Sequence, residues 1–568
     1  MAAGRASFEV QVFKEDHWVT EEVRETESSA RSVARTIFSR RSCQGVRIIK
    51  NWERSDGLVT ESVIFSEQRE PEAPQVSIVP IEAAPVCRKT SDYYRLESRI
   101  TINRLFRKYL EKVYLTPTEL IHNYKALQKV QQVDTLFPAA VDRVATIQAR
   151  AVGDEPKGRR DEVFRSVAQM TQKARKAEEH PQLPTLKGGD FNRVVERVEQ
   201  IAPPDEVDYY SLVVLSRDLV QHRNWLGKLE RLVQLTDPDK REDVLALIDG
   251  VVADLVGVPS ALQDILGYQK NLAQALCSIA DLCEGRFVSE KSDAREQIAV
   301  LGPLIAQGRM GETRKALIER LQIQLSSAQP LNRHNPEQER DAFREVANRM
   351  FRSDGFLGGP NTAAALTRRF SFMLEGGGKA ALPNAIGGVI TAMPDTQFRI
   401  AYLTELAASE LGTELSNEIF GQLRHLLRVR DLDALVPGGS PPRDKLLYAT
   451  RLYTNIESAA GVPPAQREQM LAVLDGLLST YLKRTGLIER LDDPTQALCT
   501  RATRLVEFCA AGLLPPASKA QALSRERVVA LLKQPNFDMR FIDGTSDLAQ
   551  CEEVLRDFHA LLVRAGFR

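Results

Sequence analysis

The chain has no surplus of charge of either sign. Its 568 residues include 76 lysines and arginines and 76 aspartates and glutamates, so the formal net charge is zero. Proteins dedicated to nucleic acid usually carry a basic surplus that neutralises phosphates. The balance therefore argues against nucleic acid as a partner, although a local basic face is still compatible with it.

Cysteine is sparse and irregularly spaced. The seven cysteines include no C-x-x-C pair, and an odd number cannot all form disulfides within the chain. This spacing is typical of reduced, buried thiols in the cytoplasm. The opening MAAGRASFEVQVFKEDHW becomes charged before an apolar signal segment could form. We therefore expect no signal peptide and a cytoplasmic protein.

Long apolar runs are also missing. The most apolar window, residues 244–262, contains Asp249, Asp254 and a proline, so it predicts a buried helix rather than a membrane span. Apolar residues make up 43% and charged residues 27%, which is an ordinary globular balance, and the length predicts two to four domains. Arginine outnumbers lysine by 55 to 21, as is typical of a GC-rich bacterial genome.

Residues 1–68 have the pattern of a small α/β module. Alternating apolar residues over 8–23 predict a hairpin. A helix with its start near Ser28 follows, and a second hairpin over 46–65 surrounds Asp56-Gly57, two residues that tolerate positive φ in a turn. The predicted order is ββαββ, a sheet with one helix on its apolar face.

Residues 69–90 contain four prolines and no sustained periodicity. This composition predicts an extended linker. The alternative is that the segment docks as a strand through Val76, Ile78 and Ile81.

From Ser91 onward the chain reads as helical nearly to its end, with no hairpin signal. We expect one helical domain over 91–355 and a second over 356–568, both arrays of antiparallel helices. The fold class predicted for the whole chain is thus mainly α, with a small α/β module at the N-terminus.

Small-residue triplets begin at Ala407, Ala459 and Ala510, offsets of 52 and then 51 residues. Each follows an apolar helical stretch, which predicts a two-helix repeat in the C-terminal third. Small residues allow helices to approach closely, so Ala408, Ala460 and Ala511 are expected at helix contacts. Alanine-rich helices also produce such triplets by chance, and this alternative stays open.

Local motifs exclude several chemistries. The stretch 375–379, EGGGK, has Met373 where a phosphate-binding loop needs its first glycine, and Ala380 where it needs a hydroxyl, so it predicts a glycine helix stop. The seven histidines show no metal-ligand spacing, and no G-x-S-x-G elbow occurs. We expect no metal, no cofactor and no catalytic site formed by a local motif.

One loop remains a candidate binding site. The sequence GFLGGPNT over 355–362 precedes a helix whose free amides could hold an anion. Two arginines lie further along the same helix. The predicted ligand-binding residues are Gly358, Gly359, Asn361, Thr362, Arg368 and Arg369.

A basic patch on the N-terminal module is the other candidate. It consists of Arg40, Arg41, Arg47, Lys50 and Arg54, with Trp52 on the same predicted strand as a base-stacking residue. Glutamates surround it, and mixed charge of this kind usually marks a solvated sheet face.

Two functional hypotheses follow. The favoured one is a cytoplasmic, non-enzymatic scaffold or adaptor that binds protein partners through helical surfaces. The alternative is a regulatory protein or enzyme that binds a small phosphorylated ligand near Gly358–Arg369. Neither a membrane nor nucleic acid is expected as a partner, and the sequence does not predict the oligomeric state.

Overall fold

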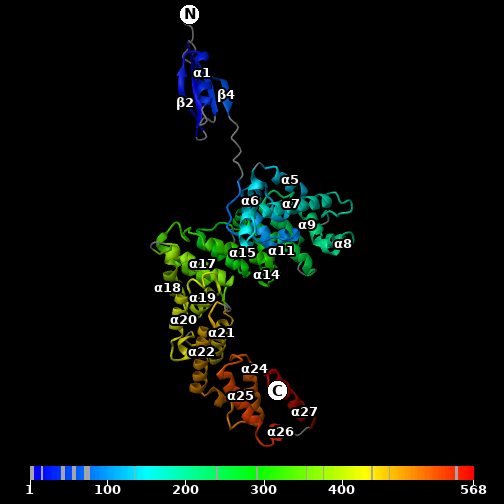
Figure 1. Ribbon diagram of the computed structural model, residues 1–568, viewed down its shortest axis with the longest axis vertical. Helices are drawn as coiled ribbons and strands as arrows, with labels where there is room; N and C mark the ends of the chain where they lie inside the picture. The colour runs from blue at the N-terminus through cyan, green and yellow to red at the C-terminus, as the bar shows by residue number, and fades with distance from the viewer. Residues whose placement is uncertain are drawn as a thin grey trace. The chain divides into compact units, whose positions relative to one another are not determined.

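The computed structural model describes residues 5–14, 17–39, 45–53, 59–68, 77–133, 135–187, 189–237, 239, 241–288, 292–352, 355–374, 377–436, 439–459, 461–543 and 548–567. The chain is mainly helical, as predicted, with 68% of its residues in helices (Figure 1). Contacts divide it into two compact units. One comprises Met1–Pro80 with Val130–Asp142, and the other Ile81–Lys129 with Arg143–Arg568. The three boundaries predicted between residues 68 and 69, 90 and 91, and 355 and 356 stay predictions.

The N-terminal module is a four-stranded antiparallel sheet with strand order β2-β1-β3-β4. Its elements follow the predicted order ββαββ: β1 (Arg5–Lys14), β2 (His17–Arg24), α1 (Glu27–Phe38), β3 (Gly45–Glu53) and β4 (Val59–Gln68). Thr26 caps α1 by accepting a hydrogen bond from the Ser29 amide. The predicted turn at Asp56-Gly57 lies outside the described residues.

The core of this module lies between α1 and one face of the sheet. Its buried residues are Phe8, Val10, Val12, Ala30, Ala34, Ile37, Val46 and Ile48. The strand residues in this set are the alternate positions of β1 and β3, because successive side chains of a strand point to opposite faces. The alternation in the sequence therefore identified the buried face correctly.

The segment after the module has no helix or strand from residue 77 to 89. From Ile81 onward it is nonetheless docked on helical residues. The Ile81 carbonyl accepts a hydrogen bond from Arg143 Nε at 2.8 Å, and the carbonyls of Pro85 and Cys87 accept from Gln148 and Arg159. Since both Ile81 and Cys87 are buried, this half of the predicted linker is part of the packed structure.

The helices between residues 90 and 350 are α2 (Leu96–Leu105), α3 (Arg107–Val113), α4 (Pro117–His122), α5 (Tyr124–Gln131), α6 (Leu136–Val152), α7 (Pro156–Glu178), α8 (Phe191–Glu199), α9 (Val207–Leu219), α10 (Trp225–Leu235), α11 (Glu242–Gly257), α12 (Pro259–Leu266), α13 (Leu272–Cys283), α14 (Arg295–Ala306), α15 (Gly311–Leu325) and α16 (Glu339–Met350). Short 3-10 helices lie at η1 (Thr90–Tyr94), η2 (Pro204–Glu206) and η3 (Pro336–Gln338).

The remaining elements are β5 (Phe351–Arg352), β6 (Gly355–Phe356), α17 (Gly359–Phe372), η4 (Lys379–Ala381), α18 (Leu382–Ala392), α19 (Thr396–Ala408), α20 (Ser416–Leu427), η5 (Leu432–Ala434), α21 (Pro442–Ser458), α22 (Pro464–Thr485), α23 (Leu487–Leu491), α24 (Leu498–Ala510), α25 (Lys519–Leu532), α26 (Phe537–Phe541) and α27 (Leu548–Arg564). The pair β5 and β6 forms a small two-stranded ribbon.

Helix α11 is largely buried inside the larger unit. It packs against α2, α4, α10, α12 and α15, and its aspartates Asp249 and Asp254 are buried. The window predicted as one buried helix is thus largely buried, but it comprises two helices, α11 and the start of α12. Within the described residues, no single helix is long and apolar enough to cross a membrane. The pair α11 and α12 meets the length and composition test only jointly and is bent by 95°.

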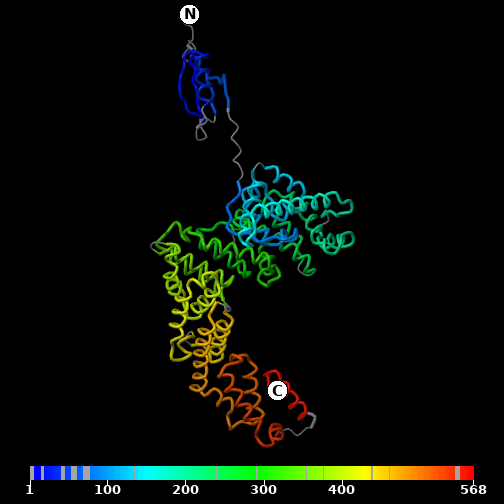
Figure 2. The backbone as a smooth tube through the Cα atoms, in the orientation of Figure 1, coloured from blue at the N-terminus to red at the C-terminus, as the bar shows by residue number. Residues whose placement is uncertain are grey.

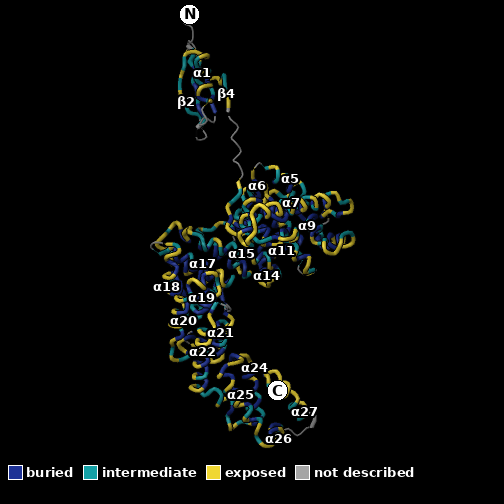
Figure 3. The backbone as a smooth tube through the Cα atoms, in the orientation of Figure 1, coloured by how far each residue is buried: buried dark blue, intermediate teal, exposed yellow. Residues whose placement is uncertain are grey.

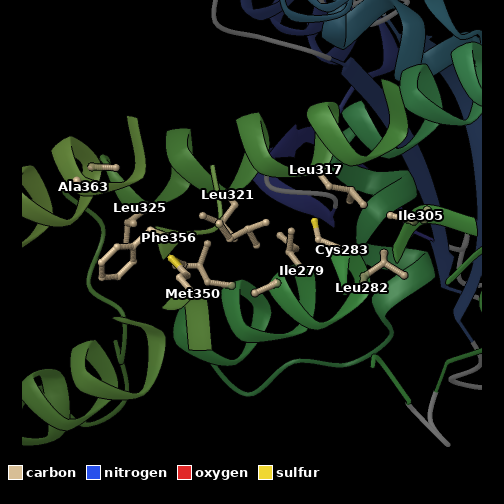
Figure 4. Close-up of a cluster of buried hydrophobic side chains, with 14 of the residues drawn as sticks. Ile279, Leu282, Cys283, Ile305, Leu317, Leu321, Leu325, Met350, Phe356 and Ala363 are labelled. Atoms are coloured by element: carbon tan, nitrogen blue, oxygen red, sulfur yellow. The ribbon is translucent and has the colours of Figure 1, made fainter. Parts of the chain in front are cut away.

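In the larger unit, one hydrophobic core runs from Leu96 to Ala520, and another holds together α24 to α27. Figure 3 marks the buried residues along the backbone. Figure 4 shows part of the first core, where Leu317, Leu321 and Leu325 of α15 meet residues of α13. Spacing of four residues places these leucines on one face of the helix. Helix α15 also packs against α17, so the core continues across the boundary predicted at 355.

From α17 onward, the main contacts join helices that are close neighbours in sequence. Helix α19 packs against α20 and α21, α22 against α21 and α25, and α24 against α25 and α27. Figure 2 shows the chain passing through these helices in order, from green to red. The earlier helices differ, because α11 also contacts α2 and α4 from far back in the sequence.

The three triplets lie at the C-terminal ends of α19, α21 and α24, where the sequence placed them. The predicted contact points are not all at interfaces. Ala408 and Ala511 are exposed, and Ala460 lies outside the described residues. The close approach is made by Gly461, on which an added Cβ would lie 1.5 Å from the carbonyl oxygen of Ala407. The first two triplets thus meet backbone to backbone.

A protease that cuts after glutamate tests the N-terminal boundary. We expect cleavage at the Glu72–Ala73 bond to precede cleavage at Glu82–Ala83, because the carbonyls flanking Glu82 accept hydrogen bonds from helical side chains. The two bonds have matching residues, so sequence preference is controlled. The fragment 1–72 should retain a β-type circular dichroism spectrum. Earlier cleavage at Glu82, or an unfolded fragment, would show that the module depends on the helices.

Gly461→Ala should lower the free energy of unfolding by about 3 kcal/mol, because the methyl group would overlap the backbone at Ala407. Urea denaturation of the full chain, followed by helical circular dichroism, measures this change. Gly476 in α22 is the matched control, since an added Cβ there meets nothing within 4 Å. Gly476→Ala should raise stability by about 0.5–1 kcal/mol. Equal effects of the two substitutions would contradict the close contact.

Candidate functional site

The predicted glycine loop does form a helix N-terminus. Gly358 has φ of 84° and precedes α17 in a left-handed conformation that favours glycine. Thr362 is fully buried, donates to the Leu357 carbonyl at 2.6 Å and accepts from Gln322 Nε2 at 3.0 Å. Gln322 also donates to the Gly358 carbonyl at 3.2 Å. The Thr362 hydroxyl is therefore already hydrogen-bonded within the chain, while Asn361 is exposed.

Arg369 is directed to a different element. It is 1% exposed and donates to the carbonyls of Leu325 at 3.0 Å, Gln324 at 2.8 Å and Gln329. These carbonyls lie at or just beyond the C-terminal end of α15, where helical carbonyls lack intrahelical partners. Burial lowers the pKa of Arg369, and Glu339 opposes that shift. The residue is a cap for α15.

Arg368 forms a surface ion pair with Glu410 at 2.6 Å. It lies nine residues after Gly359, which corresponds to about 14 Å along a helix. The structure therefore does not bring the six predicted residues together. The glycines, Asn361 and Thr362 lie at one end of α17, and both arginines interact elsewhere.

In the described residues, the EGGGK stretch and the potential metal ligands also form no binding or catalytic site. Glu375 and Gly376 of the EGGGK stretch lie outside the described residues, and Lys379 begins a 3-10 helix. Among the described residues, no group of three or more histidine, cysteine, aspartate or glutamate side chains is placed to hold a metal ion.

In the basic patch of the module, Arg40, Arg41 and Arg54 lie outside the described residues. Arg47 donates to Gln11 Oε1 at 2.8 Å, and its guanidinium lies 4.5 Å from the centre of the Trp18 ring. Lys50 lies 5.3 Å from the centre of the Trp52 ring. The described cations of the patch therefore pack on side chains of their own sheet.

A buried ionic group, not predicted from the sequence, connects α2, α4, α11 and α15. Arg99 donates to Asp254 Oδ1 at 2.8 Å and to Glu312 Oε2 at 2.5 Å. Asp254 Oδ2 accepts from the amide and hydroxyl of Thr118 at 2.7 and 2.6 Å. Burial disfavours the charge of Arg99, but the two carboxylates outweigh burial and raise its pKa. The only sequence signal was the pair of aspartates in an apolar window.

A second buried pair joins Glu119 of α4 to Lys228 of α10, with side chains 0% and 1% exposed. Lys228 also donates to the Leu219 carbonyl at 2.8 Å, and Glu119 Oε2 accepts from the Thr116 amide at 2.8 Å. Burial raises the pKa of Glu119 and lowers the pKa of Lys228, and the opposite charge of each partner counteracts the shift. All polar groups of the pair are thus used inside the fold.

His122 lies beside this pair on α4, among aromatic rings. Its ring centre is 5.2 Å from that of Tyr94 and 5.0 Å from that of Tyr209. Burial lowers the pKa of His122 to about 3, so the imidazole is neutral at pH 7, with Nδ1 2.8 Å from the Thr118 carbonyl. Because His122 is only 3% exposed, it packs as a core residue and is not open to a substrate.

A polar cleft of about 530 Å³ lies beside the docked segment, between residues 86–90 and the helices α6 and α7. Four of its lining residues are basic, namely Arg88, Lys89, Arg159 and Arg165. Its two acidic lining residues are Asp154 and Glu162. Its volume falls within the range usual for ligand sites, but it has few apolar lining residues. We call it the α7 cleft.

No protein-family model, curated protein sequence or solved structure matches the chain. The functional argument therefore depends on this geometry. The α7 cleft was missed in the sequence because its basic residues come from two segments more than sixty residues apart. The adjacent Arg88-Lys89 and the Arg159-Arg160 pair were the available local signals.

Lys228→Met tests the buried pair. The substitution leaves the Glu119 carboxylate buried without its cation, so we expect a loss of about 3–5 kcal/mol in unfolding free energy. Adding Glu119→Gln should restore part of this loss, because no buried charge then remains. Lys315→Met, which removes an exposed ion pair with Glu97, is the control and should change stability by less than about 1 kcal/mol. If Lys228→Met and Lys315→Met lower the unfolding free energy equally, burial does not make the Glu119–Lys228 pair more important than an exposed pair.

Proposed function

We propose that the chain is a cytoplasmic, non-enzymatic scaffold or adaptor that binds protein partners through helical surfaces. The observation that carries this proposal is the packing of α17 to α27, in which each helix mainly contacts near neighbours in sequence. Helices stacked in this way bury only the faces that meet their neighbours. They leave a long outer surface for partners.

The triplets add support for a repeated unit. They end α19, α21 and α24, and the first two meet through Gly461 and Ala407. A two-helix unit of about 50 residues is close to the periods of known helical repeats. In this proposal the N-terminal module binds a second partner or regulates access to the helices.

The alternative is a regulatory protein or enzyme that binds a small phosphorylated ligand near Gly358–Arg369. Only the helix N-terminus at Gly358 favours it, because Arg368 and Arg369 interact with other groups. Partner binding is therefore the function that the geometry supports better.

Affinity purification of the tagged full chain from its native host, with chemical cross-linking and mass spectrometry, tests the proposal. We expect reproducible protein partners with cross-links to the exposed Lys483, Lys519 and Lys533 of the C-terminal helices. A tagged unrelated protein is the control. An associated phosphorylated metabolite in the absence of protein partners would favour the alternative and overturn the scaffold.

A further inference from the structure

The surface of α6 and α7 already holds a segment without helix or strand, which is the chain's own segment 81–89. Side chains of these two helices donate to its carbonyls: Gln148 to Pro85 and Arg159 to Cys87. These contacts recognise backbone rather than side chains, so they suit any extended chain. The α7 cleft lies at the end of this docked segment and is lined by its residues 86–90.

The cations at the cleft are only partly neutralised. Arg159 is 5% exposed at its side chain and pairs with Glu162 at 2.6 Å. The side chains of Arg88, Lys89 and Arg165 make no hydrogen bond or ion pair with any residue that the structure describes. Two nearby carboxylates oppose these three cations: Asp154, which lines the cleft, and Asp92, which is already paired with Arg95. The other acidic lining residue, Glu162, is paired with Arg159. The cleft therefore carries a net positive charge.

Among the residues that the structure describes, the cleft has no set of free, converging hydrogen-bond donors that would hold a compact oxyanion such as phosphate. Asp92 Oδ2 accepts from the amides of Arg88 and Lys89 at 2.9 and 3.0 Å, so these donors are already used. Arg159 is likewise occupied by Gln148, Glu162 and the Cys87 carbonyl. The cleft also has no aromatic lining residue on which a nucleotide base could stack. What remains is three exposed cations spread over an open cleft.

Spread cations match a ligand whose negative charges are also spread. We propose that the α7 cleft binds an acidic, extended peptide segment of a partner protein. Arg88, Lys89 and Arg165 contact its carboxylates. This inference rests on the proposed scaffold function and specifies the chemistry of one partner.

Fluorescence anisotropy with the full chain and a labelled ten-residue glutamate peptide tests it. Replacing Arg88, Lys89 and Arg165 together by glutamine should weaken binding by at least about fivefold, because long-range attraction and contact are both lost. Binding to the unchanged protein should also weaken as salt is added. A glutamine decamer of equal length should bind neither protein.

The matched control replaces three exposed cations away from the cleft, Lys176, Arg193 and Arg340, by glutamine. It removes the same total charge, so unchanged affinity supports a local site. Equal weakening in both triple variants, or no binding to the unchanged protein, overturns the proposal. Displacement of the peptide by micromolar inorganic phosphate overturns it too, since that outcome would identify an oxyanion site.

The outcome is separable from that of the scaffold proposal. Peptide binding at the cleft without any partner in the purification would leave the site standing and remove the scaffold function. If the peptide does not bind but protein partners stay bound to the glutamine variant, the scaffold function stands and the proposed peptide site is removed.

Discussion

The buried ion pair between Arg99 and Asp254 joins α2 to α11 in the interior of the larger unit. The Asp254 side chain is 1% exposed, and its neighbours along α11 are apolar. Its carboxylate pairs with Arg99 and accepts two hydrogen bonds from Thr118. Together with the bond from Arg99 to Glu312, these contacts connect α2, α4, α11 and α15. Removing a single partner would leave a buried charge without compensation.

Much of the fold was predictable because it depends on local periodicity. The alternation in β1 and β3 predicted the buried face of the sheet, and the apolar window over 244–262 predicted the burial of α11. The docking of residues 81–89 was not predicted in this form, because the alternative to a linker was a strand through Val76, Ile78 and Ile81, and residues 77–89 form no strand. The proline content of a segment predicts only its local conformation. The position of this segment is set by hydrogen bonds from the side chains of Arg143, Gln148 and Arg159.

The candidate site was predicted less well, for a geometric reason. Consecutive helical residues point about 100° apart, and in this structure Arg368 pairs with Glu410 while Arg369 is directed to α15. Arg369 has instead a partner 44 residues earlier in the chain, which no local pattern reveals. The glycine conformation at Gly358 was predictable, because it depends only on the backbone at the helix start. A site assembled from distant segments, such as the α7 cleft, has no fixed spacing of residues in the sequence by which it could be recognised.

The capping of α15 by Arg369 has a consequence for how the chain is made. During synthesis α15 leaves the ribosome first, and its last carbonyls have no partner from α17 until Arg369 has followed. The Gln324 carbonyl already accepts from Ser327, whereas the Leu325 carbonyl gains its donor only when Arg369 has followed. The last turn of α15 is therefore completed by a residue made more than forty positions later in the chain.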